Sequence, residues 1–211
     1  MEISEKEVLR YLGYRGAAAD ERILEQIRQI STELAACVRP RNVYGIWDCR
    51  VNPPRVAMGG LDIKSGSLAG HLDGCEQVAL LAATLGAGAD ELIRRYSVRE
   101  MEKAAVAGAV CASMIEAYCD EIEKEIAQKA DELHLTARFS PGYGDFDMTH
   151  QKDIWKLLDC GRRIGLMMTE GAMLVPSKSV IAVIGFSPVK RCVKRKCESC
   201  NDRQCEFREA T

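Results

Sequence analysis

The stretch from Arg138 to Tyr143 holds the residue types best suited to binding a small ligand. It reads RFSPGY, in which Pro141 fixes its φ angle and Gly142 permits backbone angles that other residues avoid. Such a turn holds a guanidinium and a phenol at a fixed separation without forming helix or strand. The guanidinium suits a carboxylate, the phenol offers an aromatic face and a hydroxyl, and the backbone could contact an adenine or a ribose. The alternative is an ordinary surface turn with a solvated arginine.

A second stretch, near the C-terminal end, has the residue types of a metal site. Its cysteines follow the pattern Cys192-x4-Cys197-x2-Cys200-x4-Cys205. Four thiolates are enough to hold tetrahedral zinc or an iron–sulfur cluster. Nearby basic side chains would favour the thiolate form: these are Lys190, Arg191, Lys194, Arg195 and Lys196. Zinc and iron–sulfur both remain open, and the alternative is a tail with free thiols.

The RxxPGY pattern resembles the S-adenosylmethionine-binding signature of the cobalamin-dependent methionine synthase activation domain. Further stretches resemble the same family: residues 114–118 (MIEAY), residues 152–158 (KDIWKLL) and, at the family's spacing, residues 169–176 (TEGAMLVP) followed by 179–180 (SV). Residues 10–14 and 82–86 are similar to short, unfused members of the family. The resemblance covers about residues 1 to 187, and it implies a free-standing activation domain.

The resemblance also implies roles for individual residues. Arg138 would pair with the carboxylate of S-adenosylmethionine, since a bidentate arginine–carboxylate pair is strong and directional. Glu116 would accept a hydrogen bond from the ligand's amino group and offset its positive charge. Tyr143 and the backbone of Ser140 would contact the nucleoside or ribose end, with Gly142 shaping the turn. Without the resemblance, Glu116 would be interpreted as a solvated side chain at the edge of an apolar stripe.

The reaction implied by the family is reductive methylation. Cob(II)alamin takes an electron from a reduced donor such as flavodoxin or ferredoxin, and the product takes the methyl group of S-adenosylmethionine. No corrinoid-binding DxHxxG pattern is evident in the chain. The cobalamin is therefore expected on a partner, a corrinoid-binding methyltransferase protein. That partner is either methionine synthase or a related corrinoid methyltransferase, and the sequence leaves the choice open.

Composition limits the other classes of function. The chain has 211 residues, 47% of them hydrophobic, and a net charge of −2, which suits one globular domain with a proper core. It shows no apolar run of about 20 residues and no signal-peptide pattern, so we expect a cytoplasmic protein without membrane contact. A competing hypothesis is a metal-binding interaction module whose basic tail acts on nucleic acid or a protein partner. Phe207 is the one aromatic residue of that tail, so the tail offers few side chains on which nucleic-acid bases could stack. We therefore expect that nucleic acid is not a partner.

The remaining pattern predicts an α+β fold, with helices packed on a largely antiparallel, twisted sheet. Residues 1–187 would form the activation-like domain and residues 188–211 a cysteine-rich tail. Helices are expected at residues 4–13, 20–40, 90–96, 98–130 and 150–160. Strands are expected at residues 43–51, 78–85, 166–169, 173–175 and 180–186, with loops at 58–70 and 138–146.

Several chemically versatile residues receive a structural interpretation instead. Six scattered cysteines, Cys37, Cys49, Cys75, Cys111, Cys119 and Cys160, are expected to be buried thiols or metal ligands rather than disulfides. His71 and His134 are isolated and are expected to be surface or packing residues. The methionines, including Met167, Met168 and Met173, are expected to fill the core.

Overall fold

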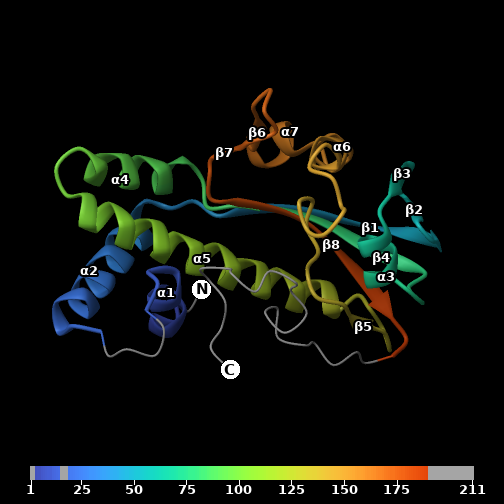
Figure 1. Ribbon diagram of the computed structural model, residues 1–211, viewed down its shortest axis with the longest axis horizontal. Helices are drawn as coiled ribbons and strands as arrows, with labels where there is room; N and C mark the ends of the chain where they lie inside the picture. The colour runs from blue at the N-terminus through green and yellow to red at the C-terminus, as the bar shows by residue number, and fades with distance from the viewer. Residues whose placement is uncertain (1–2, 15–18, 190–211) are drawn as a thin grey trace.

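The computed structural model describes residues 3–14 and 19–189 and confirms the predicted α+β fold (Figure 1). Its main sheet has six strands in the order β3-β2-β1-β4-β8-β5, and each neighbouring pair is antiparallel. The long strands β1 (Arg41–Asn52), β4 (Gln77–Thr84) and β8 (Ser179–Ser187) form its centre. The strands predicted at 43–51, 78–85 and 180–186 are therefore confirmed.

The central strand β4 is buried on both faces. Ala79, Leu81 and Ala83 pack into one hydrophobic cluster, whereas Val78, Leu80 and Ala82 pack into a second. Successive side chains of a strand point to opposite faces of the sheet. The unbroken apolar run of this strand therefore reflects a sheet that is covered by a layer on each side.

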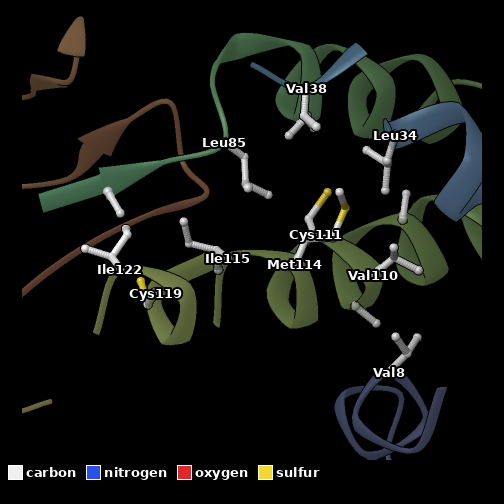
Figure 2. Packing of buried hydrophobic residues seen from close by; sticks show 14 of the residues in the cluster. Val8, Leu34, Val38, Leu85, Val110, Cys111, Met114, Ile115, Cys119 and Ile122 are labelled. Atoms are coloured by element: carbon white, nitrogen blue, oxygen red, sulfur yellow. The ribbon is translucent and has the colours of Figure 1, made fainter. Parts of the chain in front are cut away.

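The first layer contains α1 (Glu5–Tyr11), α2 (Glu21–Cys37), α4 (Ala87–Ser97) and α5 (Met101–Ala127). α5 runs along the sheet, and its first half is rich in small residues, as predicted for a core helix (Figure 1). Figure 2 shows its apolar face between the sheet and the N-terminal helices. The buried side chains of α5 that are labelled there are Val110, Cys111, Met114, Ile115, Cys119 and Ile122.

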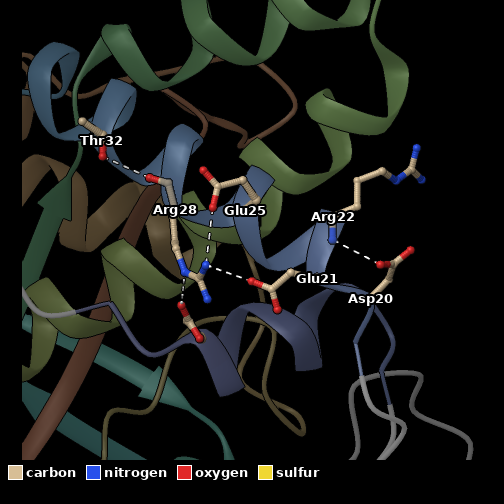
Figure 3. Close-up of polar contacts among 7 residues, drawn as sticks. Asp20, Glu21, Arg22, Glu25, Arg28 and Thr32 are labelled. Carbon is tan, nitrogen blue, oxygen red and sulfur yellow. Dashed lines mark hydrogen bonds and ion pairs between the residues drawn. The ribbon is translucent and has the colours of Figure 1, made fainter.

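Local capping residues define the ends of the two N-terminal helices. The Ser4 hydroxyl accepts a hydrogen bond from the backbone N–H of Glu7, and the Asp20 carboxylate accepts one from that of Arg22. Each satisfies a backbone donor that the helix leaves free. The Arg28 guanidinium of α2 contacts three carboxylates, those of Glu5, Glu21 and Glu25 (Figure 3).

The loop predicted at residues 58–70 is wrong, because this part of the second layer consists largely of strands and a helix. That region contains part of a hairpin, formed by β2 (Arg55–Met58) and β3 (Leu61–Lys64), and the helix α3 (Gly66–His71). Gly59 and Gly60 have φ angles of +54° and +81°, so these glycines form the hairpin turn. Gly59 and Gly60 are turn residues between strands too short to show a period, whereas Gly66 and Gly70, which also indicated a loop, lie within α3.

The rest of the second layer follows the loop at residues 138–146, which contains the RxxPGY pattern and is called the signature loop. The helix predicted at 150–160 is two helices, α6 (His150–Leu157) and α7 (Cys160–Ile164). They are separated because Asp159 adopts a left-handed conformation with φ of +51°. The predicted strands near 166–169 and 173–175 are the hairpin strands β6 (Met167–Met168) and β7 (Leu174–Val175).

The structure also tests the predictions made for the methionines and for the six scattered cysteines. Met167 and Met173 are 56% and 65% exposed, so the prediction that they fill the core is wrong. The six scattered cysteines are free thiols, and four of them are buried.

One short edge strand, β5 (His134–Leu135), was not predicted, because two residues carry no periodic signal. Among residues 3–14 and 19–189, none of the helices combines the length and the apolar composition of a membrane span.

Candidate ligand-binding site

The signature loop is attached to the edge of the central sheet. Phe139 and Val183 of β8 exchange two backbone hydrogen bonds of 2.9 Å. The His71 Nε2 lies 2.8 Å from the carbonyl oxygen of Ala137, and the imidazole ring stacks on Phe139 at 4.7 Å between centroids. His71 is therefore a packing residue, as predicted, and it holds the start of the loop against α3.

The turn itself is closed by backbone hydrogen bonds. The N–H of Tyr143 donates to Ser140 at 3.1 Å, and the N–H of Gly142 donates to Phe146 at 2.6 Å. Gly142 has φ of +97°, which an L residue adopts only under strain. Tyr143 is 52% exposed, and its ring stands edge-on to Phe139. The prediction of an ordered loop outside helix and strand is confirmed.

The far end of the loop is fixed by Asp145. Its carboxylate accepts hydrogen bonds from the Ser65 hydroxyl at 2.6 Å and from the backbone N–H groups of Gly66 and Ser67 at 2.9 Å each. These bonds, that of Ser65 first, hold the pKa of Asp145 well below its usual range. The carboxylate is therefore ionised at neutral pH and keeps the loop docked on α3.

Arg138 lies in a cluster of carboxylates on one face of α5. Its Nη2 lies 2.8 Å from Glu116, and its Nη1 lies 2.7 Å from Asp120 and 2.5 Å from Glu123. The three acids are spaced by four and three residues, so they follow one side of the helix. The arginine side chain is only 8% exposed. A cation from the signature loop is thus brought against the helix that carries Glu116.

The electrostatics of this cluster keep Arg138 charged. Burial alone would lower its pKa, but Glu123 and Glu116 outweigh that effect and raise the pKa above its usual value. Next to these acids, burial raises the pKa of the Cys119 thiol to about 12. That thiol is neutral at physiological pH, so Arg138 and its three carboxylates together carry a formal charge of −2.

The structure therefore brings two of the predicted residues, Arg138 and Glu116, into direct contact. The alternative interpretation of Glu116 as a solvated side chain is wrong, since its carboxylate binds the guanidinium. Ser140, Gly142 and Tyr143 form the turn that follows. The sequence interpretation missed Asp120 and Glu123, although their spacing from Glu116 was a signal for a shared helix face.

The predicted metal ligands, Cys192, Cys197, Cys200 and Cys205, lie outside the described residues. Within the ranges that the structure describes, no group of three or more histidine, cysteine or acidic side chains could hold a metal ion. A surface cavity of about 440 Å³ lies between α2 and α4, lined by Cys37, Leu92 and Arg95 among others. None of the five residues predicted to bind the ligand lines that cavity.

Comparison with known proteins agrees with this architecture. A solved structure described as the MetH reactivation domain bound to AdoHcy aligns with a TM-score of 0.65 at 16% sequence identity. The alignment covers 82% of this chain and 66% of that one, just under two thirds of its length. At this identity the match shows a shared fold: the chain has the fold of a reactivation domain.

The sequence match is more specific than the structural one. Residues 69–206, more than half of the chain, match the family model for the activation domain of vitamin B12-dependent methionine synthase. The chain belongs to this family. A search of curated proteins finds no matching sequence.

Proposed function

We propose that this protein binds S-adenosylmethionine at the signature loop and takes part in the reactivation of cobalamin. Membership of the activation-domain family supports the general role. The solved domain of the same fold carries AdoHcy, which supports a ligand of this chemical class. The observation that carries the proposal is the buried guanidinium of Arg138 against the acids of α5.

Each predicted residue has a chemical task in this proposal. The Arg138 fork binds the ligand's carboxylate, and Glu116 accepts from its amino group and offsets its charge. Tyr143, with its ring half exposed beside the turn, contacts the nucleoside end. The backbone of Ser140 and Gly142 supplies donors and acceptors whose positions the turn fixes. The protein's contribution is to position the sulfonium methyl group for in-line transfer.

The cobalamin and the electron are expected to be supplied by other proteins. One electron from a reduced flavodoxin or ferredoxin converts cob(II)alamin to cob(I)alamin on a corrinoid methyltransferase. The methyl group then passes to cobalt, and the sulfonium leaves as the neutral thioether S-adenosylhomocysteine. A cytoplasmic location suits these partners. A pull-down with a cob(II)alamin-loaded methyltransferase should retain the chain, and absence of any contact would contradict this part of the proposal.

The first test is calorimetric titration with S-adenosylmethionine. Arg138→Lys should bind the ligand at least about tenfold more weakly, because lysine keeps the charge but loses the bidentate fork. Arg28→Lys is the matched control, since Arg28 also contacts three carboxylates but lies on α2. It should bind like the wild type. No binding by the wild type, or equal affinity in Arg138→Lys, would overturn the proposal.

We further propose, from the sequence, that the four cysteines of the C-terminal stretch bind zinc or an iron–sulfur cluster. The thiolate number and the surrounding lysines and arginines support either metal. Anaerobically purified protein should contain zinc, or iron with visible absorption, and Cys197→Ser with Cys200→Ser should remove it. A colourless, metal-free wild-type sample would contradict this site.

A further inference from the structure

Both terminal nitrogens of Arg138 already have carboxylate partners. Nη2 is engaged by Glu116, and Nη1 is shared by Asp120 and Glu123. Each terminal nitrogen carries two N–H groups, and Asp120 and Glu123 together occupy Nη1. A ligand carboxylate that bridges Nη1 and Nη2 therefore has to replace one of these acids. The free energy needed to release that acid lowers the affinity for the ligand, so it matters which acid is released.

The three acids differ in exposure and in how much of the guanidinium depends on them. The Asp120 side chain is 61% exposed, whereas those of Glu116 and Glu123 are 33% and 26% exposed. If Asp120 leaves, Glu123 still holds Nη1 and Glu116 still holds Nη2. Release of Asp120 also costs the least free energy, because its carboxylate is the most exposed of the three and water already screens its ion pair. The geometry thus singles out Asp120 as the exchangeable partner.

We propose that Asp120 occupies, in the free protein, the position on Arg138 that the ligand carboxylate takes when it binds. This inference rests on the proposed function, because it describes the regulation of the same site. Asp120 acts as an internal competitor, and every ligand with an amino-acid carboxylate has to displace it. Glu116 and Glu123 then keep the guanidinium in place during the exchange.

The test replaces Asp120 with asparagine, a side chain of the same shape without the charge. Asp120→Asn should bind S-adenosylmethionine and S-adenosylhomocysteine about three- to tenfold more tightly, in line with the modest strength of an exposed charge pair. Affinity for 5′-methylthioadenosine, which lacks the carboxylate, should not rise. The direction of this change in affinity separates the inference from a simple charge effect, because loss of a negative charge alone would weaken binding of the cationic S-adenosylmethionine.

The matched control is Glu121→Gln, which removes the same charge one residue along α5. It should not tighten binding of any of the three nucleosides. Asp120→Ala should behave like Asp120→Asn and covers the case in which the asparagine variant does not fold, as checked by thermal melting. Unchanged or weaker binding in both Asp120 variants, or equal tightening for 5′-methylthioadenosine, would overturn the inference. If the wild type binds no S-adenosylmethionine, the proposed function itself fails instead.

Discussion

Replacing Arg138 with methionine is expected to lower the free energy of unfolding by about 2 to 4 kcal/mol at neutral pH, since three neighbouring, partly exposed carboxylates lose the buried cation that they share. Methionine preserves much of the apolar stem, so the loss reports on charge more than on packing. Three carboxylates would then face one another at the positions where they now contact one guanidinium. Urea denaturation monitored by circular dichroism measures the difference.

Arg28→Met provides the comparison, because Arg28 also contacts three carboxylates (Figure 3). Its side chain is 49% exposed against 8% for Arg138, so water screens its interactions and the variant should lose little stability. The Arg138→Met deficit should also shrink below about pH 4, where free carboxyl groups are protonated and no longer repel. Equal losses in the two variants, or a deficit that grows in acid, would contradict the structural interpretation.

The sequence predicted those features that depend on neighbouring residues. The capped helices, the small-residue half of α5 and the apolar run of β4 each carry a local signal, and each was confirmed. The hairpin before α3 was missed, because its strands are four residues each and its turn glycines resemble those of a loop. Short elements depend on pairing with a sheet, which a local pattern does not reveal.

In the candidate site, too, the features set by neighbouring residues could be predicted, whereas those set by the tertiary structure could not. The turn from Ser140 to Tyr143 could be predicted, since proline and glycine determine it locally. The partners of Arg138 could not, because acids spaced along a helix are more often a solvated face. Their pairing arises only when the Phe139 bridge to β8 brings the start of the loop against α5. The roles of Asp120 and Glu123 are therefore properties of the tertiary structure.

Gly144→Ala is expected to disrupt the other end of the signature loop. Gly144 has φ of +56°, and an added Cβ would lie 2.3 Å from the Ser67 hydroxyl and 2.7 Å from the Ser67 Cβ. The combined backbone strain and overpacking should cost about 2 to 4 kcal/mol of stability. The collision pushes against the first turn of α3, where Asp145 is bound, so the loop should shift and binding of S-adenosylmethionine should weaken. Thermal melting and calorimetry on the same sample measure both effects.

Gly60→Ala separates the two causes of the Gly144 effect. Gly60 has φ of +81°, but an added Cβ there meets no atom within 4 Å. It should lose only the backbone part, about 1 to 2 kcal/mol, and bind the ligand normally. Combining Gly144→Ala with Ser67→Gly removes the side chain that collides, so the double variant should regain ligand binding and show non-additive stability. Should Gly144→Ala alone bind S-adenosylmethionine as the wild type does, docking of the loop on α3 would not be what positions the ligand site.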